Sequence, residues 1–262
     1  MIKLDSLESN VNIGKTPSMK LDPSTHVRLC ENMAIAREII DYVKTALPHG
    51  ACNILNAKVT YDEICELRAV EIKRFRVFEE ARTKINTLIE GQGIPETIWN
   101  VLYVFLRILN ETELGIRSNV AKSYKMGNCS EYVNVALDYL KEKGAPRRAE
   151  AIADRLNDHI FIVIDRDPNG ILNDVTTWGS SALICDPWAK RIIFPERFDQ
   201  EFTSIFSRHL SPPKTFLEKK EFSVYYRHDD TLVGLFSRYI GKFFFTLACL
   251  DLFFNHSFKA YA

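Results

Sequence analysis

The spacing of the apolar residues changes near residue 145, and this change constrains the fold more than any other feature of the sequence. Before it, apolar residues recur every three or four positions, which is typical of amphipathic helices. After it, Ile160, Ile162 and Ile164 alternate with their neighbours, as residues do along a β-strand. Helices followed by strands, instead of alternating with them, predict an α+β fold with an antiparallel sheet.

We expect three helices in the first half of the chain. The first covers residues 27–47 and ends at Pro48 and Gly50. The second begins at Thr60 and Glu63, whose spacing is that of a capping box, and extends to about residue 90. A third helix is expected to begin at Pro95, because proline is favoured in a first helical turn.

The second half is expected to be rich in strands. Short apolar runs predict strands at residues 159–164, 182–186, 191–194 and 221–227, and the sequence of residues 167–170, DPNG, predicts a turn. A C-terminal helix is expected from about Thr231. These elements suggest a loosely ordered extension (1–24), a helical lobe (25–115) and a core with a β-sheet and the C-terminal helix (116–262).

Composition excludes several classes of protein. Of the 262 residues, 46% are apolar and 26% are charged, as in ordinary soluble proteins. Lys+Arg and Asp+Glu both number 34, so no nucleic-acid footprint is indicated.

No apolar run follows Met1, so we expect no cleavable signal peptide. The apolar stretch 243–254 contains Asp251 and is too short to span a bilayer; a buried helix is favoured, with a helix on a membrane surface as the alternative.

The six cysteines are scattered and include no CxxC pair. We therefore expect reduced thiols and a reducing, cytoplasm-like environment. No Cys/His set has the spacing of zinc ligands, so neither a metal nor another cofactor is expected. Five of the cysteines are interpreted as small core residues: Cys30, Cys52, Cys65, Cys185 and Cys249.

Cys129 differs from the other cysteines in its surroundings. It follows Gly127 and Asn128 and precedes a helical stripe that ends at Gly144, a suitable C-cap. At a helix N-terminus, the aligned peptide dipoles stabilise the thiolate, which is the nucleophilic form. The backbone N–H of Cys129, together with Asn128, is the candidate for binding an oxyanion.

Two further residues with suitable chemistry lie at the ends of predicted strands. His159 opens the strand at 159–164, and Asp186 closes the strand at 182–186. If these strands pair, Asp186 can orient the imidazole and stabilise its protonated form. Asp158 is the alternative, but adjacent strand residues point to opposite faces, so Asp186 is favoured. Trp178 and Trp188 either line a substrate cleft or pack in the core.

Three segments together resemble a known group of enzymes. MGNCSEYVNVALDYL, NDHIFIVID and TWGSSALICDPWAKRIIFP resemble papain-like and transglutaminase-like cysteine enzymes of bacteria, in particular effector-type proteins, over roughly residues 120–200. The resemblance implies a papain-like α+β fold with a helical lobe against an antiparallel sheet. It assigns Cys129 as nucleophile, His159 as general base and Asp186 as orienting acid. It also implies a bacterial protein delivered into a host cell, with a protein substrate there.

A Cys-His-Asp triad predicts acyl transfer from an amide of a protein substrate. Hydrolysis of a peptide bond would make the chain a thiol protease, and hydrolysis of a glutamine side chain would make it a deamidase. Transfer to a lysine amine would make it a transglutaminase, and the sequence leaves these three open. A different class is a non-catalytic adaptor that binds a protein partner through the charged helices at 27–90.

Overall fold

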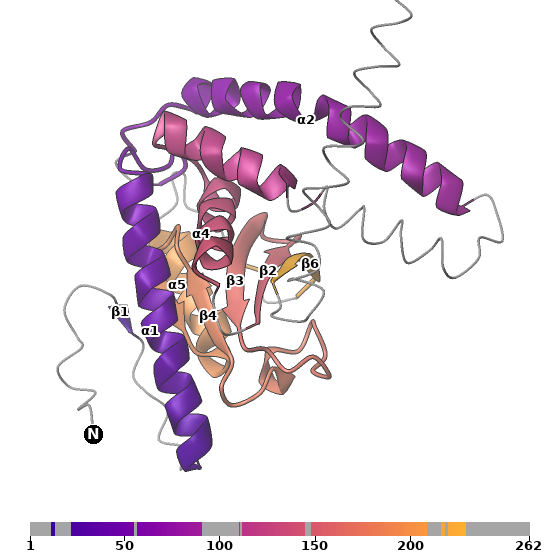
Figure 1. Cartoon of the computed structure of the whole chain (residues 1–262). Coiled ribbons are helices and arrows are strands. Elements are labelled where there is room, and N and C mark those ends of the chain that lie inside the picture. Colours follow the sequence, from indigo (N-terminus) through magenta and orange to yellow (C-terminus); the bar gives the residue numbers. More distant parts are fainter. Residues whose placement is uncertain are drawn as a thin grey trace, which may run out of the picture. The chain divides into compact units, whose positions relative to one another are not determined.

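The computed structural model, shown in Figure 1, describes most of the first 228 residues. Described are residues 12–13, 22–54, 57–90, 110, 112–144, 148–208, 216–217 and 220–228. Contacts divide the chain into one unit of residues 1–73 and 114–229 and a second of residues 74–113 and 230–262. This grouping differs from the expected boundary between residues 115 and 116, because the first helix packs on the sheet. The first unit contains every candidate site residue.

Within the described residues, the sheet has six strands in the order β1-β5-β4-β3-β2-β6. Their bounds are Asn12–Ile13 (β1), Ala149–Asp154 (β2), His159–Ile164 (β3), Leu183–Asp186 (β4), Arg191–Ile193 (β5) and Phe222–His228 (β6). All neighbouring strands are antiparallel except β1, which pairs with β5 in parallel. The predicted α+β class is therefore confirmed. Within the expected extension at 1–24, Asn12–Ile13 pairs with β5.

The described helices are α1 (Pro23–Ala46), α2 (Tyr61–Glu90), α4 (Cys129–Lys143) and α5 (Phe198–Arg208), and residues 112–124 are also helical. Short 3-10 turns, η2 (Val175–Thr177) and η3 (Pro195–Arg197), precede β4 and α5. The predicted helices from Pro95 and from Thr231, including the apolar stretch 243–254, lie outside the described residues. No pattern in the sequence indicated β2 or α5.

The helix starts follow from local side-chain chemistry. Asp22 caps α1, since its Oδ1 accepts hydrogen bonds from the backbone N–H groups of Ser24 (3.0 Å) and Thr25 (3.1 Å). The capping box predicted for α2 is present: the Thr60 N–H donates to Glu63 Oε2 at 2.7 Å, and the Glu63 N–H donates to Thr60 Oγ1 at 3.3 Å. Both helices thus begin at residues that satisfy their free N–H groups.

Helices cover both faces of the sheet. On one face α1 and α4 pack together, and Asn32 of α1 donates a hydrogen bond to the Ser181 carbonyl at 2.8 Å. Cys185 of β4 also faces α1, where its thiol contacts the Ala36 carbonyl at 3.6 Å. The next residue, Asp186, must therefore point to the opposite face. On that face, Phe161 of β3 packs against α5, with 5.2 Å between its ring centroid and that of Phe202.

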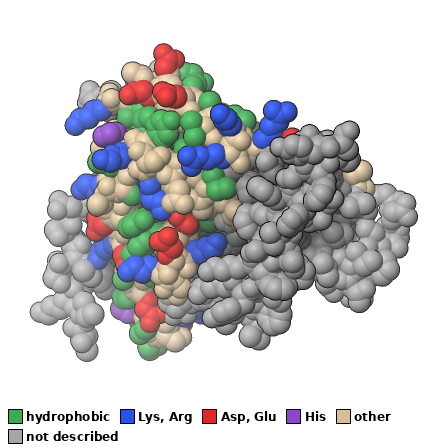
Figure 2. All heavy atoms as spheres, turned by 45° about the horizontal axis from the view of Figure 1, so that its top comes forward, with side chains coloured by type: hydrophobic (Ala, Val, Ile, Leu, Met, Phe, Trp, Pro, Cys, Tyr) green, Lys and Arg blue, Asp and Glu red, His purple; other side chains and the backbone are tan. Residues whose placement is uncertain are grey.

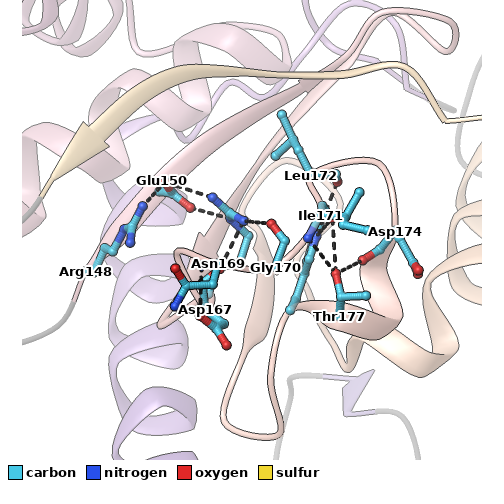
Figure 3. A network of polar contacts seen from close by, with 11 residues as sticks. Arg148, Glu150, Asp167, Asn169, Gly170, Ile171, Leu172, Asp174 and Thr177 are labelled. Carbon is cyan, nitrogen blue, oxygen red and sulfur yellow. Dashed lines mark hydrogen bonds and ion pairs between the residues drawn. The ribbon is translucent and has the colours of Figure 1, made fainter.

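A buried ion-pair network fixes the predicted turn at 167–170 (Figure 3). Glu150 is fully buried and accepts hydrogen bonds from Arg166 Nε at 2.6 Å and Arg148 Nη2 at 2.8 Å. Burial raises the pKa of Glu150, but the two arginines more than offset this, so its pKa is lowered overall. Arg166 Nη1 also donates to the carbonyl groups of Asp167 (3.1 Å) and Gly170 (3.0 Å). The network therefore attaches the turn to β2.

Replacing Arg166 by alanine should strongly destabilise the chain, because Glu150 would lose an arginine partner while remaining buried. We expect the free energy of unfolding to fall by about 3 kcal/mol, measured by urea denaturation. The control is Arg155→Ala, since Arg155 is exposed and its side chain bonds, among the described residues, to Ser223 Oγ at 3.3 Å. Equal stability losses in the two variants would contradict a structural role for the buried network.

Candidate active site

Cys129 is the first residue of α4, as predicted, and Asn128 is the N-cap. The Asn128 N–H donates to Glu131 Oε2 at 2.7 Å, so the buried Glu131 side chain folds back over the helix start. Gly127 allows this fold, since a Cβ atom there would lie 2.3 Å from the Cβ of Glu131. At the other end of α4, Gly144 has a left-handed φ of 64°, as expected for a C-cap.

His159 and Asp186 meet across two neighbouring strands. The strand register pairs Ile162 with Cys185. Continuing it by one residue puts Asp186 opposite Phe161, on the same face as His159 and diagonal to it. His159 Nε2 lies 2.7 Å from Asp186 Oδ2, and the other carboxylate oxygen accepts a hydrogen bond from the Ala189 N–H at 3.0 Å. The carboxylate is therefore held from both sides.

Asp158, the alternative acid, has a different position. It is exposed, and its φ of 50° is in the left-handed region, where the chain turns into β3. Within the described residues, the carboxylate bonded to the His159 ring is that of Asp186. The structure thus brings His159 and Asp186 together, as expected from the sequence, while their catalytic roles stay predictions.

The electrostatics of His159 favour its protonated form. Burial lowers its pKa, but the charge and hydrogen bond of Asp186, with a further hydrogen bond and charge contribution from Cys129, raise the pKa from 6.5 to about 10. Since Nε2 is engaged by Asp186, Nδ1 is the ring nitrogen left for Cys129. Cys129, His159 and Asp186 thus form an arrangement suited to nucleophilic attack.

The protonated His159 also predicts a pH dependence of stability. The folded chain binds this proton more tightly than the unfolded chain does, so the stabilisation is fully present below pH 6.5 and is lost as the pH rises through about 10. We expect the difference in unfolding free energy between the native chain and His159→Gln to shrink over this range, by up to about 1.4 kcal/mol per pH unit. Urea denaturation at a series of pH values measures it. A difference that stays constant would contradict the assigned protonation state.

Aromatic side chains hold the His159 ring in place. Its centroid lies 5.2 Å from Trp188, 5.6 Å from Phe202 and 5.6 Å from Phe206, each ring meeting it edge-on. Trp188 Nε1 in turn donates to Asn53 Oδ1 at 3.2 Å. These contacts restrict rotation of the imidazole and exclude water from most of its surface.

Trp178, the other candidate for the substrate cleft, packs in the core. Its side chain is 0% exposed, and its indole N–H donates to the carbonyl groups of Ile171 and Leu172, each at 3.2 Å. Its ring lies 5.7 Å from that of Phe222. The packing alternative therefore holds for Trp178, and the expectation that it lines a cleft is wrong. The turn η2 directs its side chain inward.

The side-chain amide of Asn128, predicted to help bind an oxyanion, is directed toward Cys52. Its Oδ1 accepts a hydrogen bond from the Cys52 N–H at 3.3 Å, and its Nδ2 lies 3.5 Å from the Cys52 sulfur. The backbone N–H of Cys129 has no intrahelical acceptor, since it lies in the first turn of α4. An oxyanion site built from Asn128 and Cys129 stays a prediction.

Two charged residues near the site were missed by the sequence reasoning. Asp154 pairs with His159 in the register of β2 and β3, is buried, and accepts a hydrogen bond from Asn157 Nδ2 at 2.7 Å. Burial raises the pKa of Asp154. Arg68 of α2 forms an ion pair with Glu131, with 3.3 Å between Nε and Oε1. The sequence does not single out Asp154 or Arg68, because an Asp at a strand end and an Arg on a charged helix are common. Only their contacts in the structure place them near the site.

The other cysteines are less uniformly buried than expected. Cys30 and Cys65 are exposed, on the outward sides of α1 and α2, so their interpretation as core residues is wrong. Cys52 and Cys129 are half-buried. Cys185 is buried, as predicted, and Cys249 lies outside the described residues.

The described surface carries charges of both signs. Figure 2 shows acidic and basic side chains interspersed on one face. This agrees with the sequence, in which Lys+Arg and Asp+Glu each number 34. Among the described residues, no group of three or more His, Cys, Asp or Glu side chains could hold a metal ion. In the same part of the chain, no helix is both long and apolar enough to cross a membrane.

Comparison of the chain with protein-family models, with curated proteins and with solved structures finds no significant match. The site is defined by its own geometry, above all by the hydrogen bond between His159 and Asp186.

Proposed function

We propose that this chain is a cysteine-nucleophile acyl-transfer enzyme with a papain-like arrangement of Cys129, His159 and Asp186. The observation that carries the proposal is the position of His159. Its Nε2 is bonded to Asp186 at 2.7 Å, and the side chain of Cys129 contributes to raising its pKa to about 10. Buried groups whose pKa is strongly shifted by a specific charged partner cluster at catalytic sites, which supports the proposal.

The proposed reaction begins with the Cys129 thiolate and the protonated His159. The thiolate attacks the carbonyl carbon of an amide, and the backbone N–H of Cys129 stabilises the resulting oxyanion. As the C–N bond breaks, His159 gives its proton to the leaving amine, and a thioester with Cys129 remains. Asp186 keeps the ring oriented through both steps and stabilises its protonated form.

The thioester has two possible fates, which define the reaction class. Attack by water, with His159 now accepting a proton, releases a carboxylic acid; the enzyme is then a thiol protease or a glutamine deamidase. Attack by a lysine amine gives a new amide and makes the enzyme a transglutaminase. The resemblance to effector-type enzymes favours a protein of a host cell as the substrate.

Mass spectrometry of protein substrates tests the proposal. A host-cell extract is incubated with the chain and a tagged primary amine, and a parallel sample receives Cys129→Ala. New chain termini indicate a protease, conversion of Gln to Glu a deamidase, and incorporation of the tag a transglutaminase. An extract that shows none of these changes relative to the Cys129→Ala sample would contradict the proposal.

A further inference from the structure

Arg68 is a basic side chain beside the candidate nucleophile that the triad does not use. Its Nε lies 3.3 Å from Glu131 Oε1. The Arg68 side chain is 43% exposed, whereas that of Glu131 is 2% exposed. The guanidinium group therefore lies between the buried carboxylate and the solvent.

A chain of contacts connects Arg68 with the start of α4. Glu131 bonds to Arg68 through Oε1 and to the Asn128 N–H through Oε2, and Asn128 directly precedes Cys129. Burial lowers the pKa of Arg68, but the charges of Glu131 and Cys129 more than offset this and raise it overall. Through these two contacts of Glu131 the guanidinium is tied to the start of α4, whose first residue is Cys129.

The outer edge of this guanidinium is available to a ligand. Within the described part of the chain, Arg68 Nη1 and Nη2 donate to no group, since the single contact to Glu131 is made through Nε. Arg166 provides a contrast, because its Nε, Nη1 and Nη2 all have acceptors and its side chain is only 4% exposed. An arginine with two free terminal nitrogens can bind a carboxylate through both.

We propose that Arg68 binds a carboxylate of the substrate, so that the amide attacked by Cys129 lies next to an acidic side chain of the substrate protein. This inference rests on the proposed function and adds a substrate class to it. A purely structural role for Arg68, neutralising the buried Glu131, is the competing explanation. It predicts that any preference between anionic and neutral reagents at Cys129 does not depend on Arg68.

The test compares two reagents of nearly equal size, iodoacetate and iodoacetamide, at Cys129. In both reactions the thiolate forms an S–C bond and iodide leaves, but only iodoacetate carries a carboxylate. Peptide mapping gives the rate at Cys129 for each, and their ratio is the readout. In Arg68→Gln we expect the iodoacetate-to-iodoacetamide ratio to fall roughly fivefold to tenfold, as for loss of one nearby charge. Arg68→Lys keeps the charge but not the two parallel donors, so its ratio should lie between those of the native chain and Arg68→Gln.

Two controls separate this effect from changes in folding or in overall charge. Arg76→Gln removes a charge from the same helix, about 12 Å further along its axis, and should leave the ratio unchanged. If Arg68→Gln alone folds poorly, a second pair of variants is used. The single variant Glu131→Gln is compared with a double variant that carries both Arg68→Gln and Glu131→Gln. The side-chain amide introduced by Glu131→Gln would still accept the Asn128 N–H, and neither variant leaves a buried carboxylate unpaired. The ratio should be lower in the double variant.

The outcomes distinguish this inference from the proposed function. An unchanged ratio in Arg68→Gln or in the double variant, with rapid iodoacetamide labelling of Cys129 retained, would overturn the role of Arg68 alone. Slow labelling of Cys129 by both reagents in the native chain would contradict the proposed function, and this inference with it.

Discussion

Replacing Cys129 by alanine should abolish turnover while leaving the fold intact. The nucleophile forms the covalent intermediate, so its removal closes the acyl-enzyme route, and we expect a loss of roughly 10⁴-fold or more in kcat. Cys129 is half-buried at a helix start, and alanine is well tolerated in helices, so the thermal midpoint should change little. Activity and thermal unfolding are measured on the same preparations.

Cys52→Ala is the matched control for this substitution. Cys52 is also half-buried and lies 3.5 Å from the Asn128 amide, yet it has no histidine partner among its described contacts. We expect its replacement to retain most of the activity. Full turnover by Cys129→Ala, or equal losses in the two variants, would contradict the assignment of Cys129 as nucleophile.

Replacing Asp186 by alanine should reduce the rate strongly, though less than loss of the nucleophile. The imidazole would lose both its orientation and the charge that raises its pKa. We expect a loss of roughly 10²- to 10⁴-fold in kcat, because Cys129 and His159 remain. The high-pH limit of activity should also move to lower pH, as the pKa of His159 falls.

Asp158→Ala and Asp186→Asn sharpen this prediction. Asp158 is exposed and turns away from the ring, so Asp158→Ala should remain near the activity of the native chain. Asp186→Asn conserves shape but leaves one carbonyl oxygen for two donors, the His159 ring and the Ala189 N–H. Its loss of kcat should therefore lie between those of Asp158→Ala and Asp186→Ala. An inactive Asp158→Ala beside a nearly normal Asp186→Ala would mean that Asp158 is the orienting acid.

The elements that position the candidate triad could be predicted from the sequence because local signals determine them. Gly127 and Asn128 mark the start of α4, and alternating apolar residues mark β3. The contact between His159 and Asp186 then follows from strand pairing and the alternation of side chains. Each of these steps needs only neighbouring residues and the geometry of a sheet.

The missed elements depend on distant contacts. In β2, Glu150 is fully buried and pairs with Arg148 and Arg166, so the strand has no clear apolar pattern. The two-residue strand β1 exists only through its pairing with β5. The position of Arg68 beside Cys129 likewise depends on how α2 packs near the start of α4, which its charged sequence does not indicate.

Site-selective alkylation of the native chain tests the central claim most directly. Limiting iodoacetamide is added at neutral pH, and peptide mapping follows the labelling of Cys30, Cys52, Cys65 and Cys129. Exposure alone predicts that Cys30 and Cys65 react first. Activation by His159 predicts instead that half-buried Cys129 reacts fastest, and that His159→Gln removes this advantage. Labelling in the order of exposure, unaffected by His159→Gln, would contradict a catalytic Cys129 and favour a non-catalytic adaptor.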